Sequence, residues 1–194
     1  MKDSLKIAIA GATGYTGIQL VKILLKHPKV KISYLCAQKS IGKSISFFDN
    51  DIKGRKLPKI SKISKIDWST INVLFTALPN GEAQEIAKNI PKHILLIDLS
   101  ADFRLEDHKA YKKWYGLEHK AKHLIKDSIY AISEFTKKKI RNYRIISCPG
   151  CYPTSIQLAL IPLLKDRMIN VKNIIVDSKS GYSGAGKKIE KKFT

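Results

Sequence analysis

The sequence predicts an α/β protein built on a Rossmann-type, mostly parallel sheet with helices on both faces. An apolar run at residues 5–10 passes through a glycine-rich loop into an apolar helical repeat. Further runs at 73–77 and 94–98 are apolar almost throughout, as strands buried on both faces are. We therefore expect a nucleotide-binding domain at residues 1–148 and the beginning of a second domain at 149–194.

Composition indicates a globular chain. Its 194 residues suffice for one domain and part of another. A hydrophobic content of 44% excludes intrinsic disorder, and no apolar run approaches the roughly 20 residues that span a bilayer. The N-terminus leads into the first strand without the apolar core of a signal peptide, and three cysteines fit reduced thiols. We expect a soluble, cytoplasmic protein without membrane contacts.

The formal net charge of +20 raises the question of nucleic-acid binding. Only five of the 36 basic residues are arginines, and the lysines are scattered through nearly every segment. Proteins that read bases and phosphates rely on arginine forks. We therefore expect no nucleic-acid partner, and we interpret the lysines as a solvated surface that steers anionic small molecules.

The first strand is followed by a G-x-x-G-x-x-G loop at the start of a helix. Glycines at these positions let a backbone approach a pyrophosphate, which then lies at the helix N-terminus. Short-chain dehydrogenases use this spacing too, but they also need a lysine four residues after a tyrosine, and none of the eight tyrosines has one. The expected cofactor contacts in this loop are Gly11, Thr13, Gly14, Tyr15, Thr16 and Gly17.

The end of the second predicted strand, residues 31–37, indicates which dinucleotide binds. An NAD-binding domain usually places a carboxylate here, where it holds the ribose 2′-hydroxyl. This chain instead continues with Gln38, Lys39 and Ser40. A lysine and a hydroxyl suit a 2′-phosphate, so we predict NADP(H) as the cofactor, bound in part by Lys39 and Ser40.

Residues 41–70 show weak periodicity and predict short strands and loops. After the strand at 73–77 we expect a helix through Ile90, and after the strand at 94–98 a loop that carries Arg104. Ligands bind beyond the carboxyl ends of such strands, and a guanidinium fork suits a phosphate. The alternative is a surface salt bridge from Arg104 to Asp102 or Glu106. A further helix is expected at 109–117.

A predicted strand at 143–147 and an apolar helix after it place Cys151 near a helix start. Backbone N–H groups and the helix dipole favour a thiolate there, so we predict that Cys151 is a nucleophile. A redox dithiol with Cys148 and a buried structural cysteine remain alternatives. Zinc needs four ligands, and Cys36 is the only other thiol, without histidines at metal spacing. We expect no metal.

Residues 149–154, Pro-Gly-Cys-Tyr-Pro-Thr, resemble the active-site signature of the N-acetyl-gamma-glutamyl-phosphate reductase family, which is related to the aspartate-semialdehyde dehydrogenases. Residues 77–81, 99–104 and 180–186 are also similar to segments of that family. The resemblance implies that Cys151 is the catalytic nucleophile and that Arg104 binds substrate phosphate. It further implies cofactor contacts from Leu78, Pro79, Ser100, Ser180, Gly181 and Gly184.

The reaction implied by the resemblance is the NADPH-dependent reduction of N-acetyl-L-glutamyl 5-phosphate to the 5-semialdehyde in arginine biosynthesis. It would proceed through a thioester on Cys151 and release phosphate. The family usually has Asn where this chain has Cys148, which suggests the hypothesis that mild oxidation joins Cys148 to Cys151. The alternatives are a non-catalytic NADP-binding sensor and the related reductase of lysine biosynthesis, which acts on an aminoadipyl phosphate.

The positions of the histidines indicate whether this chain contains every catalytic group. All five precede Cys151, whereas the catalytic histidine of the family lies in a later α+β catalytic and dimerisation domain. We therefore expect an N-terminal fragment in which that domain is truncated, inactive alone, from a full-length protein that is a homo-oligomer. A strand at 172–177 and a glycine-rich loop at 178–187 are predicted for the truncated part.

Overall fold

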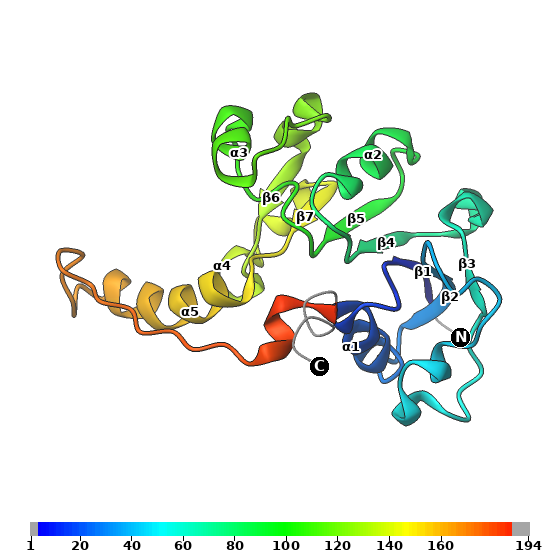
Figure 1. Cartoon of the computed structure of the whole chain (residues 1–194). Helices are drawn as coiled ribbons and strands as arrows, with labels where there is room; N and C mark the ends of the chain where they lie inside the picture. The colour runs from blue at the N-terminus through cyan, green and yellow to red at the C-terminus, as the bar shows by residue number, and fades with distance from the viewer. Residues whose placement is uncertain (1–3, 188–194) are drawn as a thin grey trace. The chain divides into compact units, whose positions relative to one another are not determined.

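The computed structural model describes residues 4–187. By contact density the chain divides into two compact units, Met1–Cys148 and Pro149–Thr194. The first unit contains a seven-stranded sheet, and the second begins with a helix; each is described by itself below (Figure 1).

Every strand pair in the sheet is parallel, and the strand order is β3-β2-β1-β4-β5-β7-β6. This order confirms the predicted Rossmann-type fold, in which the chain builds one side of β1 first and then crosses to the other. The strands are β1 (Leu5–Ala10), β2 (Val30–Cys36), β3 (Ile60–Ser61), β4 (Val73–Thr76), β5 (Leu95–Asp98), β6 (Ser128–Tyr130) and β7 (Ile145–Ser147).

Side-chain alternation along β1 explains why helices cover both faces of the sheet. Ala8 and Ala10 belong to one apolar cluster, which includes Ala87 and Ile90 from α2 and the residue after it. Ile7 and Ile9 belong to a second cluster, which includes Val21 from α1. Figure 1 shows α1 and α2 on opposite sides of the sheet. The helices of this unit are α1 (Tyr15–Leu24), α2 (Glu82–Asn89), α3 (His108–Tyr115) and α4 (Ser133–Thr136).

The weakly periodic stretch at 41–71 forms short 3₁₀ turns around β3. These turns are η1 (Ile45–Phe47), η2 (Asn50–Ile52), η3 (Ile63–Lys65) and η4 (Trp68–Thr70). Ile45 in η1 and Ile52 in η2 are buried in the core, and so are Ile66 and Ile71, which directly follow η3 and η4. The sequence carries no regular period here because single isoleucines, in the turns or directly after them, are buried rather than a continuous face.

The second unit has α5 (Cys151–Lys165), as expected, but the predicted strand at 172–177 is wrong. That stretch is irregular, and Ile175 is 93% exposed. A strand needs a neighbour with which to exchange backbone hydrogen bonds, and no other strand lies within the described part of this unit. A 3₁₀ turn, η7 (Tyr182–Ala185), follows.

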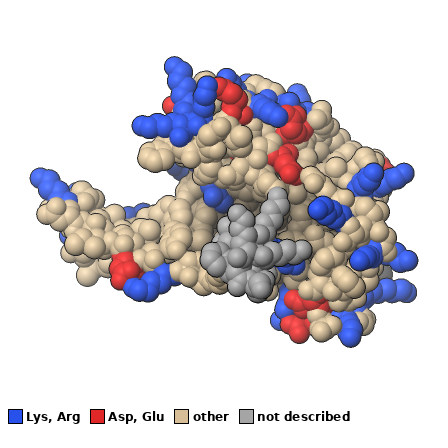
Figure 2. Space-filling view, in the orientation of Figure 1, with Lys and Arg blue, Asp and Glu red and all other residues tan. Residues whose placement is uncertain are grey.

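Charged side chains are dispersed over the first unit, with acidic groups among the basic ones on the face seen in Figure 2. No helix within residues 4–187 is long and apolar enough to cross a membrane.

Candidate nucleotide site and thiol

The strand order reverses between β1 and β4, where the chain leaves one half of the sheet for the other. In open parallel sheets this reversal opens a crevice beyond the carboxyl ends of the strands, and ligands bind there. Three loops meet at this edge: the glycine loop after β1, the segment after β2, and the segment between β4 and α2.

The glycine loop has the backbone that a pyrophosphate site requires. Gly11 has φ +84°, and a Cβ on it would lie 2.1 Å from Ala77 O, so the loop presses against the end of β4. A Cβ on Gly17 would lie 2.2 Å from Gly11 O, so α1 packs directly on the loop. At Gly14 the nearest atom to such a Cβ, Gly11 O, is 3.5 Å away, which leaves that surface open.

Gly14 is also the N-cap of α1, and no side chain caps the helix there. The first N–H groups of a helix have no acceptor within the helix and attract anions. Thr13 and Gly14 are half-buried in the loop, Tyr15 and Thr16 begin the helix, and Gly17 is buried in its first turn. The six residues predicted to contact the cofactor therefore surround one helix N-terminus.

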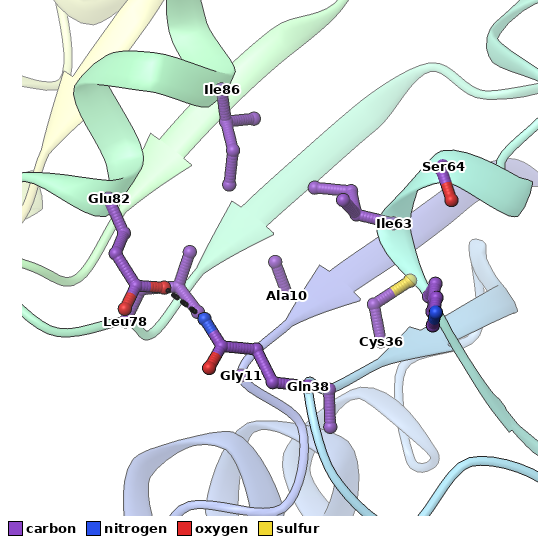
Figure 3. Close-up of a pocket in the computed structure, with 11 residues that line it drawn as sticks. Ala10, Gly11, Cys36, Gln38, Ile63, Ser64, Leu78, Glu82 and Ile86 are labelled. Carbon is purple, nitrogen blue, oxygen red and sulfur yellow. Dashed lines mark hydrogen bonds between the residues drawn. The ribbon is translucent and has the colours of Figure 1, made fainter.

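A cavity of about 400 Å³ adjoins this loop on the side of β2 and β3 (Figure 3). Its wall begins with Ala10 and Gly11 at the end of β1 and includes Leu78 from the loop after β4. The other residues that line it are Cys36, Ala37, Gln38, Lys62, Ile63, Ser64, Glu82 and Ile86.

A hydrogen bond crosses the crevice above β1. Gln38 Nε2 donates to Glu82 Oε2 at 3.2 Å, as the dashed line in Figure 3 shows. Gln38 follows β2 and Glu82 begins α2, whereas β1 lies between β2 and β4. The bond therefore joins the two sides of the strand-order reversal beside Gly11.

The loops after β4 and β5 are tied together by buried polar groups. Leu78 N donates to Ser100 Oγ at 3.4 Å, and Ser100 N donates to Asp98 Oδ1 at 3.0 Å. Thr76 Oγ1 donates to the same carboxylate oxygen at 2.7 Å. Burial raises the pKa of Asp98. These bonds fix Leu78 and Ser100 at the sheet edge, next to exposed Pro79.

A second buried carboxylate, Asp102, supports the start of α2. Its Oδ1 accepts from Gly81 N at 2.6 Å and from the Tyr111 hydroxyl at 2.7 Å, and its Oδ2 accepts from Gln84 N at 3.2 Å. The side chain is 0% exposed, and burial beside this carboxylate raises the pKa of Tyr111. Asp102 thus joins the loop after β5 to the loop and helix after β4.

His119 completes this network. Its Nδ1 accepts from Ala121 N at 3.2 Å, so its Nε2 carries the proton that it donates to Asp102 O at 2.8 Å. Burial lowers the pKa of His119, and the ring packs edge-on against Phe103 and Tyr111. This histidine is therefore a neutral structural group.

Arg104 lies beyond β5 and is half-buried. Its Nε donates to Cys148 O at 2.9 Å and its Nη2 donates to Leu99 O at 3.1 Å. It forms no ion pair with Asp102, Glu106 or any other described residue, so the alternative of a surface salt bridge is wrong. The N–H groups of Nη1 have no acceptor in the described part of the chain and remain available to an anion.

The three thiols have different surroundings. Cys151 is exposed and is the first residue of α5, whose N-cap, Gly150, provides no side-chain cap. Cys148 is partly buried, and its N–H donates to Asp98 O at 2.7 Å. Burial, together with the Asp98 carboxylate, raises the pKa of Cys148 to about 11. Cys36 is buried in the cavity wall, and burial raises its pKa as well.

Several predicted residues lie apart from the cavity. Lys39 and Ser40 occupy the loop after β2 but do not line it, and Ser40 has φ +65°. Ser180, Gly181 and Gly184 lie in the second unit, are exposed, and form a local turn. A Cβ on Gly184 would lie 2.4 Å from Ser180 Oγ, so local packing within the turn explains why this position is a glycine.

The cavity also includes residues that the sequence analysis missed, among them Lys62, Ile63, Glu82 and Ile86. Glu82 and Ile86 share a helix face by their spacing of four, which is a signal that the sequence contains. Lys62 reaches the cavity only because β3 pairs with the end of β2, and a strand of two residues gives no readable pattern.

Comparisons with known proteins agree with this architecture. The family model "Semialdehyde dehydrogenase, NAD binding domain" matches residues 6–143, and "Semialdehyde dehydrogenase, dimerisation domain" matches residues 151–194. A crystal structure of aspartate semialdehyde dehydrogenase II from Vibrio cholerae aligns with a TM-score of 0.66 at 21% identity, covering 96% of this chain and 49% of that one. A structure of aspartate semialdehyde dehydrogenase with NADP from Candida albicans aligns with a TM-score of 0.54 at 19% identity, covering 84% of this chain and 48% of that one.

Sequence relatives are more similar. The N-acetyl-gamma-glutamyl-phosphate reductase of Ehrlichia ruminantium (strain Gardel) is 46% identical over 194 residues, covering 99% of this chain and 56% of the relative. The "probable" chloroplastic enzyme of that name from Oryza sativa subsp. japonica is 42% identical over 185 residues, covering 95% of this chain and 45% of the relative. The chain thus spans about half the length of these relatives. With its domain model matched across residues 6–143, the chain belongs to the semialdehyde dehydrogenase family.

Proposed function

We propose that this chain forms the nucleotide-binding and nucleophile-bearing part of an N-acetyl-gamma-glutamyl-phosphate reductase of arginine biosynthesis. The observation that carries the proposal is the 46% identity to a relative of that name over 99% of this chain, which includes Cys151 at the start of α5. The reaction is the NADPH-dependent reduction of N-acetyl-L-glutamyl 5-phosphate to the 5-semialdehyde, with release of phosphate.

The residues at the sheet edge fit a dinucleotide. The open surface at Gly14, the uncapped start of α1 and the adjoining cavity provide room for a pyrophosphate and for one nucleoside. Gly11, Thr13, Gly14, Tyr15, Thr16 and Gly17 would hold the pyrophosphate, and Leu78, Pro79 and Ser100 would lie along the cofactor beyond it. A bound NADPH supplies the hydride in this chemistry.

Cys151 is proposed as the nucleophile because its thiol is exposed at a helix N-terminus, where a negative sulfur is favoured. The thiolate attacks the acyl carbon of the acyl phosphate, the carbon–oxygen bond to phosphate breaks, and a thioester remains on Cys151. After hydride addition to the thioester carbonyl carbon, the carbon–sulfur bond breaks and the semialdehyde leaves. The sulfur then returns to its thiolate form.

Arg104 is proposed to bind the phosphate of the substrate. Its hydrogen bond to Cys148 O anchors the guanidinium to the segment that leads, three residues later, to Cys151. Two donors on Nη1 have no acceptor among the described residues, so they can pair with two phosphate oxygens.

The acid/base group and the assembly are proposed to come from other parts of the protein. His119 is committed to the Asp102 network, and the relatives have about as much chain again as this one. We propose that the additional length supplies the proton-transferring histidine. The match of residues 151–194 to a dimerisation domain supports a homo-oligomer, and we propose a cytoplasmic location. Ser180, Gly181 and Gly184 are proposed to close over the cofactor.

The test uses a protein that carries this chain together with the remaining length of its relatives. Cys151→Ser should abolish phosphate-dependent reduction of NADP⁺ by N-acetylglutamate semialdehyde, the reverse reaction, while NADP⁺ binding is unchanged. Mass spectrometry of the unaltered protein given acyl phosphate without NADPH should show an acyl adduct on the Cys151 peptide. Full turnover by the Cys151→Ser protein would contradict the proposal.

The cofactor site has its own test, which the 194-residue chain permits. Gly14→Ala should fold normally, because its methyl group meets no atom closer than 3.5 Å, but should bind NADP⁺ at least about tenfold more weakly as that group faces the pyrophosphate. Gly17→Ala should instead destabilise the fold by about 1–3 kcal/mol through the clash with Gly11 O. Calorimetric titration and urea unfolding separate the two effects. Unchanged NADP⁺ affinity in Gly14→Ala would contradict the site.

A further inference from the structure

The position of the cavity indicates which end of the dinucleotide it would receive, if the proposed function holds. The glycine loop lies at the centre, at the end of β1. Arg104, the proposed phosphate-binding residue, follows β5, so the reacting end of the cofactor belongs on the side of β4 and β5. The cavity lies on the other side, at the ends of β2 and β3. It therefore belongs to the adenosine end.

Apolar side chains in the cavity suit a flat base. Figure 3 shows Ile63, from η3, and Ile86, from α2, extending into the same space from different elements. Both side chains are partly buried, and both pack against the apolar cluster on the α2 face of the sheet. A purine between these two side chains would place its ribose toward the end of β2.

Charge in the cavity wall is divided between two residues, Lys62 and Glu82. Glu82 begins α2, on the β4 side of β1, and its carboxylate accepts a hydrogen bond from Gln38. The Lys62 ammonium has no ion pair and no hydrogen bond with any residue in the described range 4–187. The side of the cavity next to β3 therefore presents an uncompensated positive charge.

Strand pairing brings this charge to the end of β2. Cys36 pairs with Ser61, and Ala37 N donates to Ser61 O at 3.1 Å, so Lys62 begins beside Ala37. The ribose 2′ position of a bound dinucleotide lies at the end of this second strand. Lys39 is two residues further along and lies outside the cavity.

We propose that Lys62, from the segment after β3, is the cation that binds the 2′-phosphate and determines the preference for NADP(H) over NAD(H). Lys39, the lysine that the sequence pattern suggested, then has a minor part. This assignment rests on the proposed binding of a dinucleotide, and it adds a specificity-determining residue that is distant in sequence from the glycine loop and from the end of β2.

Two adenosine fragments test the assignment directly. Adenosine 2′,5′-bisphosphate and adenosine 5′-monophosphate differ only in the 2′-phosphate, and isothermal titration of the 194-residue chain gives an affinity for each. Lys62→Gln should reduce the ratio of the two affinities by about 10- to 100-fold, the value of a charge-assisted contact, with less than about a twofold change for the monophosphate. Lys65→Gln, an exposed lysine three residues away, is the matched control and should keep the wild-type ratio.

Lys39→Gln distinguishes the two lysines. If Lys39→Gln reduces the ratio and Lys62→Gln does not, the assignment to Lys62 is overturned and the one from the sequence pattern replaces it. An unchanged ratio in both variants also overturns it. If the wild-type chain binds neither fragment nor NADP⁺, the proposed function fails together with the assignment, whereas tight wild-type binding with an unaltered Lys62→Gln ratio overturns the assignment alone.

Discussion

At the scale of single residues, the three thiols differ in their access to solvent. Cys151 is exposed, whereas burial raises the pKa of both Cys148 and Cys36. Iodoacetamide at pH 7.5 should therefore alkylate Cys151 at least about tenfold faster than the other two. Peptide mapping by mass spectrometry at successive times measures the three rates, and Cys151→Ser is the control. Faster labelling of Cys148 would contradict this order and favour a reactive dithiol.

The buried ring of His119 makes stability depend on pH. Burial lowers its pKa from 6.5, so His119 binds a proton at a lower pH in the folded protein than in the unfolded chain. Above pH 6.5 neither state is protonated and the contribution is constant. Below it, the free energy of unfolding should fall by up to about 1.4 kcal/mol per pH unit.

Urea unfolding at pH 7.5, 6.0 and 5.0 measures this dependence. His119→Gln, whose amide can still donate to Asp102 O, should be less stable at pH 7.5 but should lose less stability on acidification. His123→Gln, at an exposed histidine, is the matched control and should follow the wild type. Equal acid sensitivity in His119→Gln and the wild type would show that another group causes it.

The positions of residues were predictable where they depend on local sequence. The place of Cys151 at a helix start follows from the strand and the helix on either side of it, and the glycine loop before α1 follows from three glycines at fixed spacing. The hydrogen bond from Arg104 to Cys148 O was not predictable, because the two residues lie 44 positions apart in the chain. Lys62 and Glu82 reach one cavity through strand pairing and helix placement, which no local pattern specifies.

At the scale of elements, a carboxylate accepts the first backbone N–H groups of both α2 and α3, but one carboxylate is buried and the other is exposed. Asp102 is buried and receives backbone N–H groups from α2 and its N-cap, whereas exposed Asp107 caps α3 through Lys109 N and Ala110 N. Asp102→Asn should cost about 2–3 kcal/mol of unfolding free energy, because its amide turns a donor toward buried donors. Asp107→Asn should cost under about 0.5 kcal/mol, because asparagine is a good N-cap.

Urea unfolding of the two variants beside the wild type measures the difference. Both variants make the same chemical change in a carboxylate that accepts two backbone N–H groups at a helix start. Asp102 differs in being buried, in reaching α2 from the loop after β5, and in accepting the Tyr111 hydroxyl. Similar losses in both would mean that the Asp102 network contributes no more than an ordinary cap.

The main elements of the first unit were predictable because β4 and β5 are apolar almost throughout and α1 and α2 each bury one face. The three residues of β6, none of them buried, gave no such signal. The failed prediction at 172–177 shows the limit of this reasoning. An apolar, β-branched run is a strand only where another strand receives its hydrogen bonds, and the sequence of the run does not contain that partner. The 3₁₀ turns at 45–70 escaped prediction because single buried isoleucines leave no period.

At the scale of the whole molecule, nucleotide binding and chemistry should be separable. The cavity and glycine loop lie within the first unit, whereas Cys151 belongs to the second and the relatives have further chain. The 194-residue chain should therefore bind NADP⁺ in a calorimetric titration yet reduce it with N-acetylglutamate semialdehyde and phosphate at under about 1% of the rate of the longer protein. Comparable rates would contradict the need for an additional proton-transferring group.

Because the strand order reverses at β1, the residues proposed to select the coenzyme and those proposed to react with the substrate come from different stretches of the chain. The cation beside β3 is encoded before residue 63, whereas the guanidinium after β5 and the sulfur after β7 are encoded some forty residues or more downstream. On the proposed assignment to Lys62, a descendant could exchange one coenzyme for the other by substitutions in the earlier stretch alone. Its reactive chemistry would pass through the exchange unaltered.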